Sequence, residues 1–149
     1  MDRALPEDFD VDYQVTRLVR RIRVRTIGRL TEIHPDLDYN SLVMFIAIAD
    51  APGGIRAADL AEALHVHKST ISRAVAALER MDLVQRAPDP DDGRAQVITA
   101  DPQGRDRLEA YRRQSHEWLA RLLSDWQPDE LRTFAALLGR LNDAADRTE

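Results

Sequence analysis

The stretch from Asp59 to Arg94 constrains the fold of this chain more than any other part of its sequence. It contains two helical patterns separated by the short break His65-Val66-His67. Two helices joined by a tight turn, the second with small polar residues and an arginine on its outer face, are typical of a helix-turn-helix with a recognition helix. The inward positions are Leu60, Ala61 and Leu64 in the first pattern and Ile71, Val75 and Leu78 in the second.

Two short segments rich in apolar residues follow the second helix and predict a β-hairpin. They cover Leu83–Ala87 and Ala95–Thr99, and the turn formers of Pro88–Gly93 separate them. A hairpin in this place is the wing of a winged helix. Ile55–Ala57 is a candidate third strand for the same sheet. The pattern therefore predicts a protein that binds double-stranded DNA in a sequence-specific manner.

The expected DNA contacts lie in the first turns of the recognition helix and at the end of the wing. Hydroxyl groups and arginine can bind base edges, and arginine also enters a narrow minor groove. Ser69 has a second explanation as the N-cap of its helix. Asp92 is expected to orient an arginine, whereas Asp89 to Asp91 are interpreted as a solvated turn. The expected contacts are His67, as a phosphate ligand, then Lys68, Ser69, Thr70, Ser72, Arg73 and, at the wing, Arg94.

The charge balance does not favour DNA at first sight, because the net charge is −5. Charge distribution matters more than the sum, and the acids fall largely at the termini and the wing tip. The chain has no cysteine, no apolar run long enough for a membrane span and no signal-peptide pattern. These features predict an intracellular, cytoplasmic protein.

Long helices are expected at both ends. The first is expected to begin near Pro6, Glu7 and Asp8 and to end at Pro35, with an arginine stripe on its outer face. These arginines are either solvated or paired with acids of a partner subunit (Asp143, Asp146 or Glu149), or they help to bind an anionic effector or to flank DNA. The stripe consists of Arg17, Arg21, Arg25 and Arg29, with Arg20 and Arg23 beside it.

Three further helices complete the expected layout. Asp38 is the expected N-cap of a buried central helix, Tyr39–Asp50. Another helix is expected from Pro102 to about Leu123, and Pro128 is expected to open the last one. The apolar stripe of that last helix is too long to be covered by a small winged helix. It consists of Leu131, Phe134, Leu137, Leu138 and Leu141.

The central stretch resembles the MarR family of winged helix-turn-helix transcriptional regulators. The matching residues include Asp59-Leu60-Ala61, Ser69-Thr70-Ile71-Ser72-Arg73, Leu83-Val84, Arg86 and the wing's Asp92-Gly93-Arg94. Through this resemblance Arg86 joins the expected DNA contacts. Two positions depart from the family pattern without threatening the fold: Asp82 stands where glycine is common, and Ala100-Asp101 replaces Leu-Thr.

The resemblance implies a single domain, 1–149, that is mainly α with a small β-wing. The DNA-binding region would cover 39–100, and residues 1–35 and 102–149 would form dimerisation helices. The family also implies a homodimer on a palindromic operator and a small anionic or phenolic effector. Candidate effector ligands are Tyr39, Phe45, Trp118 and Arg21.

Other chemistries find little support in the sequence. His65 and His67 lack a third metal ligand nearby, and nothing resembles a catalytic triad or a phosphate loop. We therefore expect no cofactor, no metal and no enzyme activity. The leading hypothesis is a ligand-responsive repressor. The alternative is a winged-helix module that binds a protein partner and has no specific affinity for DNA.

Overall fold

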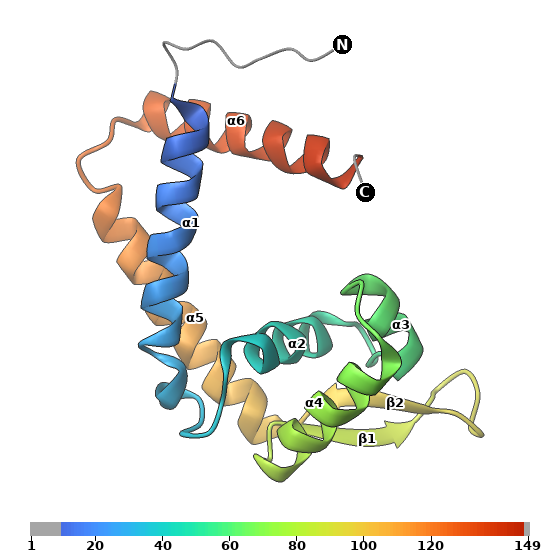
Figure 1. Ribbon diagram of the computed structural model, residues 1–149. Coiled ribbons are helices and arrows are strands. Elements are labelled where there is room, and N and C mark those ends of the chain that lie inside the picture. Colours follow the sequence, from blue (N-terminus) through green and yellow to red (C-terminus); the bar gives the residue numbers. More distant parts are fainter. Residues whose placement is uncertain (1–9, 148–149) are drawn as a thin grey trace. The chain divides into compact units, whose positions relative to one another are not determined.

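The computed structural model describes residues 10–147 and confirms a mainly α winged helix. Of these, residues 10–111 form one compact unit, and residues 112–147 form a second. In order, the elements are α1 (Val11–Ile27), a 3-10 turn (Leu30–Glu32), α2 (Tyr39–Asp50), α3 (Ala57–Ala63), α4 (Lys68–Arg80), β1 (Val84–Pro88), β2 (Gln96–Ala100), α5 (Pro102–Leu122) and α6 (Pro128–Asp146) (Figure 1).

Helix α1 is shorter than the sequence predicts at its C-terminal end. The expected start residues Pro6, Glu7 and Asp8 lie outside the described residues, and the described helix begins after the N-cap Asp10. It ends at Ile27 with Gly28 as the C-cap, so the expectation of a helix to Pro35 was wrong. The 3-10 turn that follows buries Leu30 and brings Ile33 into the core. The helical spacing of apolar residues continues past Ile27 because Leu30 and Ile33, which lie beyond α1, are also buried.

Helix α2 lies at the centre of the core of the first unit, as predicted. Leu42, Phe45 and Ile48 are almost fully buried, and α2 contacts α3, α4 and β2. The inward face of α4 packs into the same core through Ile71, Val75 and Leu78, which are also buried. The inward-facing residues predicted for the recognition helix are therefore confirmed.

Asp38 is the N-cap of α2, also as predicted. Its Oδ1 accepts a hydrogen bond from the Ser41 backbone N at 2.9 Å, and its Oδ2 accepts one from Ser41 Oγ at 2.7 Å. The backbone hydrogen bond from Ser41 is the main reason that the pKa of Asp38 lies below its ordinary value. The ionised carboxylate therefore stabilises the start of the central helix.

Replacing Asp38 with alanine is expected to lower the free energy of unfolding by about 1 kcal/mol at neutral pH. Because the folded-state pKa is depressed, this contribution is complete above the ordinary pKa of aspartate, about 3.9, and is lost as the pH falls through the depressed value. Urea unfolding from pH 7 to pH 3, at one protein concentration, measures the difference. Asp36→Ala, at an exposed position two residues earlier, is the control and should change stability by less than about 0.5 kcal/mol. A difference that stayed constant down to pH 3 would contradict this account.

The wing is an antiparallel pair whose strands lie one residue later than the sequence predicts. Val84 pairs with Ala100 and Pro88 pairs with Gln96. The predicted third strand at Ile55–Ala57 reduces to a single bridge, in which Ile55 and Ile98 exchange backbone hydrogen bonds of 3.0 and 2.8 Å. Arg56 is already the N-cap of α3, so the strand cannot continue.

Gly104 in the first turn of α5 lies directly against the backbone of Leu83, the residue before β1. A Cβ atom at this position would lie 2.5 Å from the carbonyl oxygen of Leu83 and 2.8 Å from its Cα. Both of those atoms belong to the backbone and cannot move away cheaply. Asp101 Oδ1 accepts a hydrogen bond from the Gln103 backbone N at 2.9 Å, so Asp101 caps this first turn.

Gly104→Ala is therefore expected to destabilise the protein by about 1–3 kcal/mol, the usual range for overpacking. A glycine-to-alanine change inside a helix normally has the opposite sign and stabilises by roughly 0.5–1 kcal/mol. Gly139→Ala provides the matched control, because nothing lies within 4 Å of the Cβ it would add to α6. Thermal unfolding of the two variants should shift in opposite directions. Equal shifts would show that α5 can move away from β1 at little cost.

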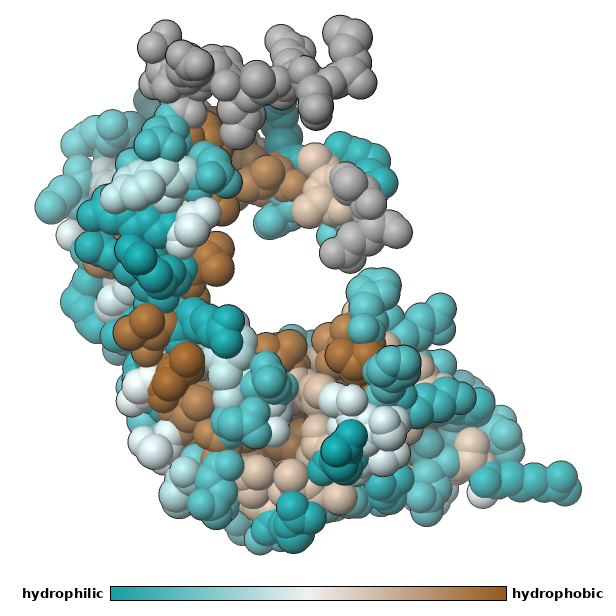
Figure 2. Space-filling view, in the orientation of Figure 1, coloured by the Kyte–Doolittle hydropathy of each residue, from teal (hydrophilic) through white to brown (hydrophobic). Residues whose placement is uncertain are grey.

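The second unit exposes much of its apolar surface. Trp126 and Phe134 pack together with ring centroids 5.2 Å apart, and Gln127 and Glu130 form a capping box at the start of α6. None of the residues of α6 is buried. Figure 2 shows apolar surface along this helix, and Leu137, Leu138 and Leu141 are 52%, 38% and 51% exposed. This helix carries an apolar stripe that its own unit leaves uncovered.

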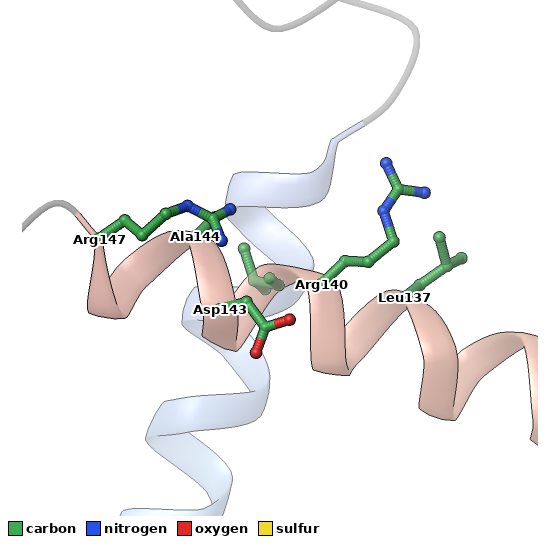
Figure 3. A pocket seen from close by; sticks show the side chains of 6 residues that line it. Leu137, Arg140, Asp143, Ala144 and Arg147 are labelled. Atoms are coloured by element: carbon green, nitrogen blue, oxygen red, sulfur yellow. The ribbon is translucent and has the colours of Figure 1, made fainter.

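An open hollow flanks this stripe on α6. Its lining carries opposite charges, because Arg140 and Arg147 lie on the same helix as Asp143 (Figure 3). Figure 3 shows the guanidinium of Arg140 and the carboxylate of Asp143 pointing in different directions from the helix. All of the lining residues come from α6 and its C-cap Arg147, so the hollow is an exposed surface rather than an enclosed pocket. They are Leu137, Arg140, Leu141, Asp143, Ala144 and Arg147.

Candidate nucleic-acid interface

The turn between α3 and α4 is built on a residue with a positive φ. His65 has a φ of 50°, its N donates to the Glu62 carbonyl at 3.1 Å, and the Val66 N donates to the Ala61 carbonyl at 3.0 Å. These two hydrogen bonds form a Schellman motif, with histidine in the position that glycine usually takes. His65 is thus a turn residue, as the sequence predicted, and His67 is the N-cap position of α4.

The end of α4 repeats this arrangement. Asp82 has a φ of 55°, its N donates to the Glu79 carbonyl at 3.1 Å, and the Leu83 N donates to the Leu78 carbonyl at 3.0 Å. Leu78 and Leu83 are both fully buried, which supplies the apolar contact typical of this motif. Asp82 therefore adopts the left-handed conformation that glycine commonly takes at such a position, and its departure from glycine leaves the fold intact, as expected. One motif thus ends α3 just before α4 begins, and the other ends α4.

The N-terminal half of α4 exposes most of the expected recognition residues. Lys68, Ser69, Ser72 and Arg73 are exposed, whereas Thr70 is half-buried. The explanation of Ser69 as an N-cap was wrong, because Ser69 is the second residue of the helix and His67 occupies the cap. The Arg73 Nε donates to the Ser69 carbonyl oxygen at 3.3 Å. This contact lays the arginine side chain along the helix toward its N-terminal end.

Arg86 lies beside α4 rather than at the end of the wing. Its Nε is 3.0 Å from Glu79 Oε1, so the pair joins β1 to the last turns of α4. Both side chains remain partly exposed. An ion pair in this setting contributes little stability, but it reduces the positive charge that Arg86 offers to a phosphate. We therefore expect Arg86 to bind DNA less strongly than the other candidate residues.

The tip of the wing presents Arg94 at the surface. Asp92 Oδ1 accepts a hydrogen bond from the backbone N of Arg94 at 3.1 Å, and the Asp92 carbonyl accepts one from the Ala95 N at 2.9 Å. The sequence predicted that Asp92 orients an arginine. In the structure it shapes the backbone turn that carries Arg94. Figure 2 shows a hydrophilic surface at this outer end of the wing.

Asp89 differs from the sequence prediction of a solvated turn at Asp89 to Asp91. It is only 8% exposed, and its Oδ2 lies 2.6 Å from the Nε of Arg56. Its Oδ1 accepts a hydrogen bond from the backbone N of Asp91 at 2.8 Å. No pattern in the sequence points to this pair, because the two residues are 33 positions apart and Asp89 lies among other turn-forming acids.

Two of the arginines expected on the first helix have contacts within the same unit, although Arg29 lies beyond the end of α1. The guanidinium of Arg23 lies 4.9 Å from the ring centroid of Tyr39, and that of Arg29 lies 4.6 Å from that of Tyr111. Arg29 is buried and also pairs with Glu32 at 2.7 Å. This hydrogen bond is the main cause that lowers the pKa of Glu32 and raises that of Arg29. Arg29 therefore leaves the exposed stripe that the sequence predicts.

The four candidate effector ligands lie in different environments. Tyr39 is half-buried beneath Arg23, and Arg21 is exposed on α1. Phe45 has no exposed surface and packs within the core. Trp118 is half-buried and belongs to the part of α5 that lies in the second unit.

Two features are absent from residues 10–147. Within this part of the chain, no helix is both long and apolar enough to cross a membrane. The same residues contain no group of three or more histidine, aspartate or glutamate side chains that could hold a metal ion.

Comparison with known sequences identifies similar proteins along most of the chain. Residues 36–95 match the model of the MarR family. An uncharacterized HTH-type transcriptional regulator of Bacillus subtilis, YxaD, is 31% identical over 134 residues, which cover 90% of this chain and 92% of that protein. The HTH-type transcriptional regulator MT0903.1 of Mycobacterium tuberculosis is 30% identical over 137 residues, covering 90% and 91%.

Solved structures with the same fold cover nearly the whole chain. A crystal structure of MarR has a TM-score of 0.72 and 26% identity, and covers 99% of this chain and 96% of its own. FabT of Streptococcus pneumoniae, crystallised in complex with DNA, has a TM-score of 0.81 at 16% identity and covers 94% and 98%. At that identity FabT supports the fold alone.

Proposed function

Because the chain belongs to the MarR family of helix-turn-helix transcriptional regulators, we propose that it binds promoter DNA as a homodimer and acts as a ligand-responsive repressor. The observation that carries the proposal is the exposed N-terminal half of α4 beside a wing that ends in Arg94. Structures of the same fold, FabT and the MepR of S. aureus, have been crystallised with DNA. The regulator would act in the cytoplasm, where bacterial promoter DNA lies.

In the proposed complex, α4 enters the major groove with its N-terminal turns toward the bases. Arg73 would bind a base edge, with Ser69, Thr70 and Ser72 as shorter contacts. Lys68 and His67, at the start of the helix, would bind phosphates. Arg94 would reach into the adjacent minor groove, where the negative potential attracts a guanidinium group. Arg86 would contribute a weaker backbone contact.

The homodimer is supported by the uncovered apolar faces of the long helices. Leu137, Leu138 and Leu141 of α6 are exposed, as are Leu18 and Ile22 of α1. An exposed apolar stripe on a helix, as each of these two helices carries, is typical of a protein–protein interface. A twofold dimer would place the two copies of α4 on successive major grooves, about 34 Å apart, and would require a roughly palindromic site.

An effector would act on the distance between the two copies of α4 in the dimer. A small anionic or phenolic molecule would change the spacing only if it bound one arrangement more tightly than the other. Tyr39, Arg21 and Trp118 are the accessible candidates for its binding. Phe45 would take part only after side chains in the core had moved, since it has no exposed surface.

Selection of DNA fragments from a random duplex pool, followed by sequencing, tests the proposal. We expect an enriched palindrome whose half-sites are one helical turn apart. A salt titration on the selected duplex should show affinity falling steeply as salt rises. No enrichment even at low salt would reject the proposal and favour a winged-helix module that binds a protein, an alternative that the net charge of −5 supports.

A further inference from the structure

The ion pair between Arg56 and Asp89 joins two segments that meet at the outer end of the wing. Arg56 follows Ile55, which bridges to Ile98 of β2, and it opens α3. Asp89 follows the last pair of the hairpin, and its N donates to the Ala95 carbonyl at 3.0 Å. The Arg56 Nε and the Asp89 Oδ2 are 2.6 Å apart. The pair therefore ties the wing to the helix-turn-helix beyond the point where the strands end.

The carboxylate of Asp89 also shapes the loop that follows. Its second oxygen accepts a hydrogen bond from the Asp91 backbone N at 2.8 Å. This hydrogen bond, followed by the one from the Arg56 side chain, is the main cause that holds the pKa of Asp89 below its ordinary value. Residues 91–94 are all exposed, so no apolar packing fixes their conformation. Figure 1 shows this loop extending beyond β1 and β2. Its shape depends on polar contacts at its base.

We propose that Arg56 and Asp89 are positioning residues for DNA binding, which hold the wing loop in the conformation that presents Arg94 to the minor groove. This inference rests on the proposed function, because it assigns Arg94 to the DNA. Holding the loop in place before binding removes the entropy cost of ordering it on the duplex. Neither Arg56 nor Asp89 needs to touch the DNA for this role.

The variant Asp89→Asn distinguishes a positioning role of Asp89 from a purely electrostatic effect of its charge on DNA affinity. The change keeps the size of the side chain and removes one negative charge. If only charge mattered, the affinity for DNA would rise, because a repulsion from the phosphates would be lost. If Asp89 positions the loop, affinity for the duplex selected above should instead fall about 3- to 10-fold, the cost of ordering one long side chain on binding.

Asp91→Asn is the matched control. It removes the same charge from an exposed position two residues along the loop, and the hydrogen bond that Asp89 accepts comes from its backbone. Its affinity should stay equal or rise slightly. Thermal unfolding of both variants confirms that the comparison is made between folded proteins. Tighter binding by Asp89→Asn, or equal effects of the two changes, would overturn the inference.

A second comparison tests whether the effect passes through Arg94. In an Arg94→Ala background, Asp89→Asn and Arg56→Ala should cause no further loss of affinity, since the residue that they position is absent. Arg56→Ala alone should leave the slope of log affinity against log salt unchanged. An undiminished loss in the Arg94→Ala background, or a slope reduced by about one, would mean that Arg56 contacts a phosphate itself.

The order of the loop can be measured without DNA. Nitrogen-15 relaxation of the free protein should give backbone order parameters near 0.85 for residues 91–94 in the wild type, falling toward 0.6 in Asp89→Asn and unchanged in Asp91→Asn. If the wild type selects no duplex, the proposed function fails, and this measurement still decides whether the pair holds the wing. Equal order parameters in wild type and Asp89→Asn would reject the pair as a positioning device.

Discussion

Replacing Arg73 with alanine is expected to weaken binding to the selected operator about 10- to 100-fold, the range for the loss of one bidentate base contact. Arg73 is exposed in the second turn of α4, and the one hydrogen bond of its side chain within residues 10–147 is the long one to the Ser69 carbonyl oxygen. The protein should keep its stability, because the side chain supports no other element. A titration with a fluorescent duplex measures the loss.

The same titration with variant duplexes shows whether Arg73 reads sequence. The preference at one base pair in each half-site should relax, whereas a phosphate contact would weaken all duplexes uniformly. Arg80→Ala is the charge-matched control, since Arg80 is exposed in the last turn of the same helix. It should change affinity only modestly at every sequence. Undiminished operator affinity in Arg73→Ala would show that another surface binds the DNA.

Much of the first unit could be predicted from the sequence, because the features that indicate its helices and caps lie close together in the chain. The inward positions of α4 follow a helical period, and Ile71, Val75 and Leu78 are buried as that period requires. The N-cap Asp38 and the left-handed Asp82 also follow from chemistry within one turn of the chain. Predictions of this kind depend on neighbours in sequence and need no knowledge of the fold.

Contacts between distant segments were missed for the opposite reason. The Arg56–Asp89 pair forms only after the wing has folded against the segment before α3. The end of α1 was also misplaced, because Leu30 and Ile33 keep a helical period while the chain turns at Gly28. An apolar period shows that residues are buried together, but it does not show that one continuous helix carries them.

The arginine stripe of α1 illustrates how compensation can be hidden from the sequence. Like charges four residues apart destabilise an isolated helix. In the structure, Arg23 lies over Tyr39 and Arg29 lies over Tyr111 and pairs with Glu32. Aromatic rings from elements later in the chain thus stabilise two of these guanidinium groups through cation–π contacts, and Glu32 adds an ion pair for Arg29. The role of the remaining arginines in a partner contact stays a prediction.

The largest effect is expected from Leu141→Asp, which should separate the proposed dimer. Leu141 is 51% exposed in the protomer, so the change costs the protomer little. In a twofold dimer both copies lose a buried leucine, at about 1.5–3 kcal/mol each, and two unpaired carboxylates enter the interface. The dissociation constant of the dimer should rise by at least about two orders of magnitude. Sedimentation velocity at micromolar concentration should then show a monomer.

Operator affinity should fall further in Leu141→Asp than in Arg73→Ala, because a monomer engages one half-site and loses the second recognition helix entirely. Ala136→Asp is the matched control: it adds the same charge at an exposed position on the opposite side of α6. That variant should remain a dimer with nearly unchanged DNA binding. If Leu141→Asp also stayed dimeric, the stripe on α6 would not be the interface, and the palindromic spacing of the operator would need another source. If it became monomeric but kept full affinity, each protomer would read DNA independently, and an effector acting on the spacing between protomers could not regulate binding.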